Sequence, residues 1–414
     1  MLTTAARQLS TYKKVLTQSS FSNQVKDSQY AVRGAIPMKG EEIKNRIKNG
    51  DLSYPFKKIT PLNIGNPQAV GQGVITYNRE VMAGLIHPDI LNSNAIGDDA
   101  KLRVRQMLGL FSTPVGAYTS NSKGHAQVRQ AIANYINARD GSEVHSDWNN
   151  IYLTNGASEG VRLCFRMLIR DKQDGVLVPI PQYPLYSALL TLDGGTMIKY
   201  YLNEETNWGI SPEDIENRIK YAKDLGINIR AMVVINPGNP TGNVLRRTDI
   251  EEIIKICHAH QVLIMADEVY QRNIYNPEVP FISFRKVLAE MGNPYKDNVE
   301  LISMHSTSKG LMGECGLRGG YFETHNLDAF ADEMLYKLKS IELCSNTMGQ
   351  ITTHLMVDPP KEGRESDSCV KTYRQQRDFI KNGLEERAKL LTETFNQMHN
   401  VTCSDIEGAM YAFP

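Results

Sequence analysis

The feature that most constrains the fold is an alternation of short apolar segments with amphipathic helical segments from about residue 150 onward. The apolar segments are residues 151–154, 175–178, 231–235, 262–265 and 301–304. Turns with glycine or proline lead into stretches where apolar residues recur at helical spacing, as in residues 161–168. Continuous apolar strands that alternate with helices predict a mostly parallel sheet covered by helices on both faces. The expected fold class is therefore α/β, and ligands of such sheets bind beyond the carboxyl ends of the strands.

Length and charge narrow the possible partners. The chain has 414 residues, which is enough for a large core and for two lobes. Lysine plus arginine and aspartate plus glutamate number 46 each, and this balance gives no reason to expect nucleic acid or an anionic membrane as a partner. No apolar run reaches the length of about 18 residues that a membrane-spanning helix needs. The six cysteines are scattered without metal-ligand spacing, so we expect free thiols and no metal site.

The two ends of the chain depart from the alternating pattern. Residues 1–26 are rich in serine and threonine and contain basic residues but no acidic residue. This composition is typical of a mitochondrial presequence and equally of a flexible N-terminal arm, so the predicted location is the mitochondrial matrix or the cytoplasm. At the other end, residues 370–400 are predicted to be helical, and residues 406–414 are predicted to begin a strand.

A lysine follows the last of the apolar segments. Lys309 comes a few residues after the expected strand at 301–304, where burial would disfavour its charged form and make the amine a nucleophile toward an aldehyde. Ser306 and Ser308 offer hydroxyl groups to a nearby anion, and Arg318 offers a planar guanidinium that suits phosphate. A surface lysine in a turn is the alternative for this motif taken alone.

A carboxylate follows another apolar segment. Asp267 lies just after residues 262–265, where an unpaired carboxylate is costly and requires a cation. A protonated pyridine nitrogen supplies that cation, and the carboxylate keeps the ring protonated so that it can accept electrons from a carbanion. Tyr270 could donate its phenol to an oxygen on the same ring. A helix N-cap at Asp267 is the alternative.

Further polar or aromatic groups follow the remaining strands. Asn239 lies in a loop with two prolines and two glycines, which holds its amide toward a ligand at low entropic cost. Ala157 and Ser158 begin a helix, whose free N–H groups suit a phosphate. Tyr183 follows the next strand and could stack on a flat ring. A plain turn, a capping serine and ordinary packing are the respective alternatives. Together, these groups meet the requirements of one cofactor, pyridoxal 5′-phosphate.

The motifs resemble those of the fold-type-I, class I/II pyridoxal-phosphate aminotransferases, and within them the alanine aminotransferase branch. The class markers are NPGNPTG at 236–242, ADEVY at 266–270, STSKG at 306–310 and GLRGGYFE at 316–323. The markers of the branch are YAVRG at 30–34, NIGNPQ at 63–68, GAYTSNSKG at 116–124, TNGASEGVR at 154–162 and PIPQYPLYSA at 179–188. The resemblance extends from about residue 15 to the end of the chain.

The resemblance implies a domain division and a set of residue roles. It implies an N-terminal arm with part of a small domain at 27–95, a large cofactor-binding domain at 96–365, and an incomplete small domain at 366–414. Lys309 would form the Schiff base and move the substrate proton. The other implied cofactor contacts are Asp267 with the ring nitrogen, Tyr270 and Asn239 with the ring oxygen, Tyr183 with the ring face, and Ala157, Ser158, Ser306, Ser308 and Arg318 with the phosphate. Gly65 would line the substrate carboxylate pocket, and Tyr118 would reach the phosphate of a neighbouring subunit in a homodimer.

The implied reaction converts L-alanine and 2-oxoglutarate to pyruvate and L-glutamate with ping-pong kinetics. Members of the family continue beyond GAMYAFP and supply an arginine that binds the substrate carboxylate, and this sequence reaches Pro414 without that arginine. Two alternatives therefore stand beside the implied reaction: a glutamate:glyoxylate type of aminotransferase from the same branch, and a catalytically inactive homologue that still binds the cofactor.

Overall fold

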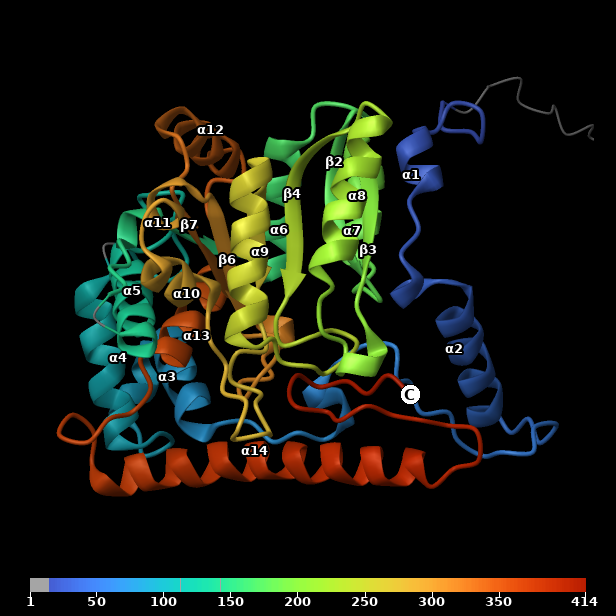
Figure 1. Ribbon diagram of the computed structural model, residues 1–414. Helices are drawn as coiled ribbons and strands as arrows, with labels where there is room; N and C mark the ends of the chain where they lie inside the picture. Colours follow the sequence, from blue (N-terminus) through green and yellow to red (C-terminus); the bar gives the residue numbers. More distant parts are fainter. Residues whose placement is uncertain (1–14, 112, 142) are drawn as a thin grey trace, which may run out of the picture.

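The computed structural model describes residues 15–111, 113–141 and 143–414. The predicted presequence or arm, residues 1–26, lies outside the described residues as far as residue 14. Within the described part, the chain forms one seven-stranded sheet with helices on both faces (Figure 1). This arrangement confirms the predicted α/β class.

The described sheet is mostly parallel. Its strands are β1 (Ile151–Thr154), β2 (Asp174–Ile180), β3 (Thr196–Tyr201), β4 (Asn228–Ile235), β5 (Leu263–Asp267), β6 (Leu301–Ser306) and β7 (Gly320–His325). Their spatial order is β1-β7-β6-β5-β4-β2-β3, and β7 runs antiparallel to both of its neighbours. The apolar segments predicted as strands lie in β1, β2, β4, β5 and β6, whereas β3 and β7 carried too weak a signal. β3 is an edge strand that alternates between buried and exposed residues, and β7 begins at a glycine and contains polar residues.

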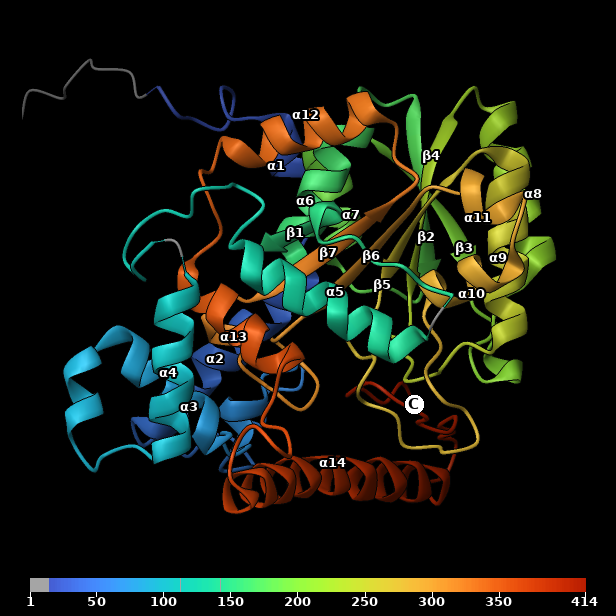
Figure 2. The same cartoon turned by 90° about the vertical axis from the view of Figure 1, so that its left-hand side faces the viewer.

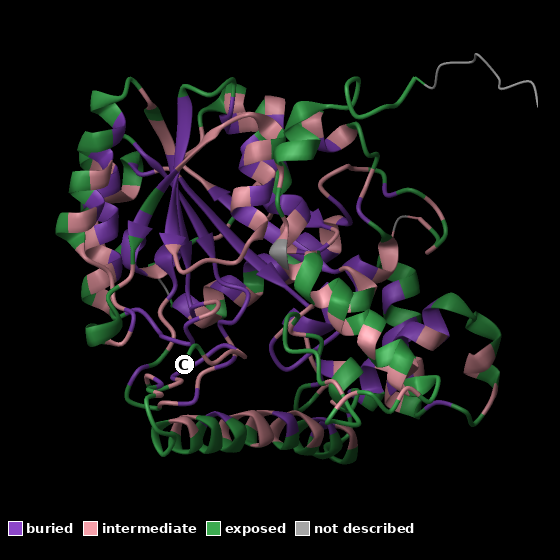
Figure 3. Cartoon of the chain, turned by 90° about the vertical axis from the view of Figure 1, so that its right-hand side faces the viewer, coloured by how far each residue is buried: buried purple, intermediate pink, exposed green. Residues whose placement is uncertain are grey.

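Both faces of the central strands are buried, which explains their continuous apolar sequences. In β4, Met232 and Val234 pack with residues of α8, α9 and α10, while Ala231 and Val233 pack with residues of α6 and α7 on the other face. Successive side chains of a strand point to opposite faces, so a strand covered on both sides needs apolar residues at every position. Figure 3 shows the strands as buried and the outer faces of the flanking helices as exposed.

The described chain also contains α-helices. They are α1 (Asn23–Asp27), α2 (Ala35–Lys48), α3 (Thr76–Ile86), α4 (Asp98–Leu110), α5 (Ala126–Asp140), α6 (Ala157–Leu168), α7 (Leu185–Asp193), α8 (Pro212–Asp224), α9 (Arg247–His260), α10 (Phe284–Met291), α11 (Tyr295–Asn298), α12 (Ala329–Ser340), α13 (Thr347–Val357) and α14 (Asp367–Asn396). α3, α4, α5 and α13 share one apolar core with residues of β1. α1 and α2 lie along the opposite side of the sheet (Figure 1).

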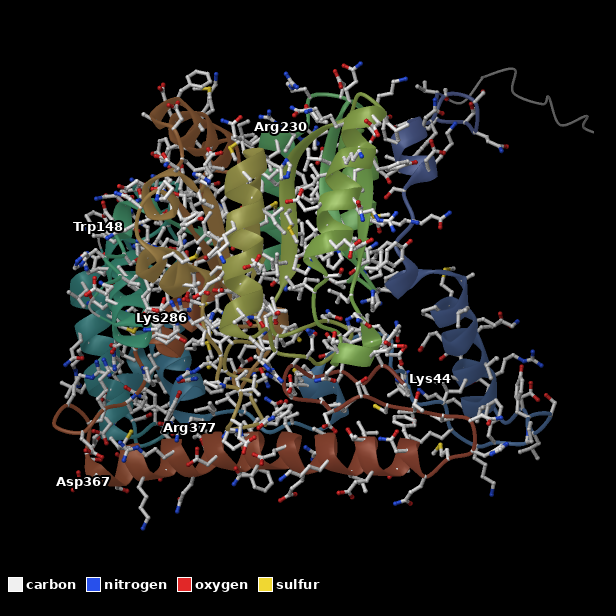
Figure 4. The ribbon with its side chains drawn as sticks, in the orientation of Figure 1. Lys44, Trp148, Arg230, Lys286, Asp367 and Arg377 are labelled. Atoms are coloured by element: carbon white, nitrogen blue, oxygen red, sulfur yellow. The ribbon has the colours of Figure 1, made fainter. Side chains whose placement is uncertain are left out.

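The C-terminal part passes below the carboxyl ends of the strands. The predicted helix at 370–400 is confirmed as α14, which crosses this end of the molecule (Figure 2). Asp367 and Arg377 lie in the first half of α14 (Figure 4). In the same view, Lys44 on α2 and Trp148 lie on opposite sides of the molecule. The predicted strand at 406–414 is wrong: only an isolated bridge joins Gly408 to Ile274. Ala409 adopts a φ of +61°, which interrupts an extended run.

None of the helices within the described ranges combines the length and apolar character needed to cross a membrane.

Candidate active site

A cavity of about 790 Å³ lies beyond the carboxyl ends of β1, β2, β4, β5 and β6. The predicted site residues that line it are Gly65, Ala157, Ser158, Tyr183, Asn239, Asp267, Tyr270, Ser306, Ser308, Lys309 and Arg318. We call the residues that follow the strands (157–158, 182–185, 239–240, 267–270 and 306–318) the strand-end wall. The opposite side consists of residues 30–33, 62–66 and 411–412, which we call the chain-end wall.

Lys309 lies just beyond β6, with its side chain directed across the cavity. Its Nζ atom donates a hydrogen bond to the carbonyl oxygen of Gly65, which is 244 positions away in the sequence. Burial lowers the pKa of the Lys309 ammonium, and the nearby charge of Arg318 lowers it further. A larger share of the amine is therefore neutral near pH 7, and the neutral amine is the form that attacks an aldehyde or accepts a proton.

Asp267 is the last residue of β5, and its side chain is buried beneath the cavity. No helix begins here in the described chain, so the alternative of a helix N-cap is wrong. The hydroxyl of Tyr186 donates a hydrogen bond to the carboxylate, and the backbone N–H of Val269 lies 3.4 Å from it. Burial raises the pKa of Asp267, while the hydrogen bond from Tyr186 lowers it. The carboxylate has no cationic partner among the described residues, so it would gain most from a cation on a bound ligand.

The start of α6 and Arg318 form an anion cradle. Gly156 precedes the helix with a φ of +79°, which favours glycine, and a Cβ atom on it would lie 2.5 Å from Nη2 of Arg318. Arg318 donates to Ser158 Oγ at 3.1 Å and to the carbonyl oxygen of Cys315 at 3.0 Å. Ser306 Oγ lies 3.0 Å from Ser308 Oγ. Helix N–H groups, hydroxyls and a guanidinium thus gather on one side of the cavity, as a phosphate requires.

Asn239 and Tyr270 also line the cavity. Asn239 reaches the cavity from the loop after β4, where the N–H of Gly238 donates to the carbonyl oxygen of Asn243 at 2.9 Å. Tyr270 donates its hydroxyl proton to Tyr411 Oη at 2.9 Å. The hydroxyl groups of these tyrosines therefore face the same cavity from opposite walls.

Tyr30 and Tyr183 line the cavity as well, and Tyr186 packs against Tyr183. The hydroxyl of Tyr183 lies 2.8 Å from that of Tyr30, and the rings of Tyr183 and Tyr186 meet edge to face at 6.4 Å. Sequence reasoning missed Tyr186, which follows Tyr183 by three positions and lies in the first turn of α7. It also missed Tyr30, Arg33 and Tyr411, because these come from the ends of the chain, where no strand-end signal marks them.

Tyr118 is the one predicted residue outside the cavity. Its side chain is 69% exposed, and it does not line the cavity described above. Its implied contact with a cofactor phosphate therefore requires a second copy of the chain.

The lining groups fit pyridoxal phosphate. The anion cradle suits its phosphate, the amine of Lys309 suits its aldehyde, and the buried carboxylate of Asp267 suits its ring nitrogen. Fold and site together are those of a pyridoxal-phosphate-dependent enzyme.

Comparison with known proteins narrows the class of pyridoxal-phosphate-dependent enzymes to one family. The chain is 44% identical over 413 residues to a probable mitochondrial alanine aminotransferase of Dictyostelium discoideum, covering 98% of this chain and 76% of that protein. It is 44% identical over 405 residues to glutamate–glyoxylate aminotransferase 1 of Arabidopsis thaliana, covering 97% and 81% of the two chains. The solved structure of an alanine aminotransferase from Pyrococcus furiosus has the same fold, with a TM-score of 0.74 and 24% identity over 95% of this chain and 84% of that one.

Residues 92–414 match the family model described as aminotransferase class I and II, and the chain belongs to this family. It is therefore an aminotransferase, and the family and its fold depend on pyridoxal phosphate.

Proposed function

We propose that the protein is an alanine aminotransferase, which interconverts L-alanine and 2-oxoglutarate with pyruvate and L-glutamate. The observation that carries the proposal is the convergence of Lys309, Asp267 and the anion cradle on one cavity. The similarity to the probable alanine aminotransferase of Dictyostelium discoideum supports the choice of substrates.

Lys309 holds the cofactor and transfers the substrate proton. When bound, pyridoxal phosphate supplies an electron-accepting ring that stabilises negative charge at the substrate Cα. With the amino acid bound, the neutral Nζ atom of Lys309 would remove the proton from Cα. The lowered pKa of Lys309 favours this step, because a general base must be unprotonated at the working pH.

The other residues of the strand-end wall would orient the cofactor and balance its charge. Burial raises the pKa of Asp267 and the hydrogen bond from Tyr186 lowers it, so Tyr186 favours the carboxylate form, which would place negative charge next to the ring nitrogen. Asn239 and Tyr270 would hold the ring oxygen of pyridoxal phosphate, and Tyr183 would cover its ring face. The phosphate would be bound by Ala157, Ser158, Ser306, Ser308 and Arg318, which would keep the cofactor oriented toward Lys309.

The proposal is tested with each half of the reaction separately. Purified enzyme loaded with pyridoxal phosphate is mixed with L-alanine alone, and pyruvate is measured together with the change in visible absorbance. The amine-loaded enzyme is then given 2-oxoglutarate, and L-glutamate is measured. We expect one equivalent of each product per site, and absence of pyruvate in the first half would contradict the proposal.

A glutamate:glyoxylate aminotransferase is the second candidate, because the chain is equally similar to such an enzyme from Arabidopsis thaliana. A panel of amino donors with 2-oxoglutarate or glyoxylate as acceptor separates the two. A higher kcat/KM for glyoxylate than for 2-oxoglutarate or pyruvate would favour this candidate.

We also propose a homodimer in which Tyr118 contacts the cofactor phosphate of the partner. The exposure of Tyr118 outside its own cavity supports this proposal. Sedimentation tests the dimer. The shared site is tested by mixing inactive Lys309→Ala subunits with Tyr118→Phe subunits and measuring activity. In a mixed dimer, one site would combine the Lys309 of the Tyr118→Phe subunit with the Tyr118 of the Lys309→Ala subunit, so activity should be regained.

The mitochondrial matrix or the cytoplasm remains the predicted location. The relative from Dictyostelium discoideum carries the word mitochondrial in its name. Residues 1–26 fused to a fluorescent protein would enter mitochondria if they form a presequence and would stay in the cytoplasm if they form an arm.

A further inference from the structure

The chain-end wall carries one charged side chain, Arg33, to which the fit of pyridoxal phosphate assigns no role. Of this wall, only Gly65 had a role suggested by sequence. The other lining residues of its N-terminal part are Tyr30, Val32, Arg33, Leu62, Asn63, Ile64 and Asn66. Most of them are apolar or aromatic, and Arg33 is the charged one.

Hydrogen bonds attach this segment to the strand-end wall. Ser28 Oγ donates to the carbonyl oxygen of Ala188 in α7 at 3.1 Å, and Tyr30 Oη lies 2.8 Å from Tyr183 Oη. Asn63 Nδ2 donates to the carbonyl oxygen of Val32 at 2.7 Å. Arg33 therefore directly follows a segment that is hydrogen-bonded to α7, to Tyr183 and, through the Val32 carbonyl, to Asn63.

The cavity has three cationic side chains, and two of them are engaged. Arg318 contacts Ser158 and neighbouring carbonyl groups, and Lys309 contacts the Gly65 carbonyl. The side chain of Arg33 has neither a hydrogen bond nor an ion pair with any residue that the structure describes. Among the residues that the structure describes, Asp267 is the one acidic residue lining this cavity, and its buried carboxylate accepts a hydrogen bond from Tyr186.

We propose that Arg33 binds the distal carboxylate of the dicarboxylic substrate, that is, the carboxylate remote from the reacting carbon. A guanidinium presents two parallel N–H groups that match a carboxylate, and the apolar side chains of Val32, Leu62 and Ile64 suit the methylene groups between the two carboxylates. A monocarboxylic substrate such as alanine has no group for this position. Arg33 thus determines specificity, and this inference rests on the proposed function.

The test uses the holoenzyme and the unreactive dicarboxylate glutarate, with the monocarboxylate butyrate as comparison. We expect Arg33→Gln to weaken glutarate binding in calorimetry by about 10- to 100-fold, the loss of a charge-assisted contact, and to leave butyrate binding unchanged. Arg33→Lys should restore part of the affinity. Arg105→Gln, an exposed arginine of α4 outside the cavity, is the matched control.

Steady-state kinetics supply the second readout. In Arg33→Gln, the KM values for L-glutamate and 2-oxoglutarate should rise by a similar factor, while kcat and the KM values for L-alanine and pyruvate stay unchanged. An equal loss for glutarate and butyrate would overturn the inference and place Arg33 at the carboxylate that all substrates share. Unchanged binding of both would also overturn it.

The two proposals can fail independently. If no amino acid reacts with the wild-type holoenzyme but glutarate binding still depends on Arg33, the transaminase proposal fails and the carboxylate site stands. If alanine reacts and glutarate binding does not depend on Arg33, the transaminase proposal stands and the carboxylate site fails.

Discussion

The two walls of the cavity are built in different ways. The strand-end wall is carried by β5, β6 and their neighbours, whose residues are almost all buried between two helical layers. The chain-end wall comes from a short helical turn at residues 31–33, from residues 62–66 and from residues 411–412, and the adjoining α2 has no buried residue. Positions fixed by a packed sheet vary little, whereas segments with few buried contacts open at low cost in free energy.

This difference suggests a division of work between the walls. Groups that move protons or balance charge must be held within a fraction of an ångström, and the strand-end wall meets that need. Groups that recognise the substrate must let it enter and leave, and the chain-end wall suits that need. Substitutions in the strand-end wall should therefore lower kcat, and those in the chain-end wall should mainly change KM or have small effects.

Lys309→Ala should have the largest effect. Loss of its proton transfer alone removes about 100- to 10,000-fold of the rate, and the covalent attachment of the cofactor is lost as well. The measurement is turnover together with the visible absorbance of the bound cofactor. Lys48→Ala, at the exposed end of α2, is the control. Transamination at wild-type rate in Lys309→Ala would end the assignment.

Asp267→Asn should lower kcat by about 100- to 1,000-fold, because a neutral amide no longer places negative charge beside the ring nitrogen. Cofactor affinity, measured by equilibrium titration, should fall much less, since the anion cradle is untouched. Asp224→Asn, on the exposed part of α8, is the control. If kcat stayed within a few-fold of wild type, Asp267 would not act on the ring.

Tyr186→Phe should lower kcat/KM by about 10-fold near neutral pH and shift its pH dependence. Burial raises the pKa of Asp267 and the Tyr186 hydrogen bond lowers it, so removing the hydroxyl raises the pKa further. Because the ionised carboxylate is the active form, the acidic limb of the kcat/KM profile should move to higher pH. An unmoved limb would mean that Tyr186 serves packing only, and Tyr221→Phe on α8 is the control.

Tyr411→Phe should have the smallest effect, about 3- to 10-fold in kcat/KM, because it removes one neutral hydrogen bond to Tyr270. The acidic limb of the pH profile should stay in place, in contrast to Tyr186→Phe. A loss as large as that of Asp267→Asn would show that the chain-end wall takes part in the chemistry and would break the division between the walls.

Sequence predicted the strand-end wall because its signals are local. A buried carboxylate or a lysine directly after an apolar strand can be identified without knowing the fold, since strand ends of a parallel sheet meet at one edge. Asp267, Lys309 and Asn239 were predicted in this way and do line one cavity. Tyr183 was found on the same basis, while its neighbour Tyr186 was overlooked.

Sequence could not place the chain-end wall, because its position depends on contacts between residues far apart in the chain. Gly65 was assigned only through the resemblance, and Arg33 and Tyr411 had no predicted place. The apolar pattern by itself determined the class of sheet and the chemistry at its edge, because burial on both faces leaves few other ways to fold such strands. Only the tertiary structure decided which residues close the cavity, since hydrogen bonds such as that from Lys309 to Gly65 join segments whose separation the local pattern does not encode.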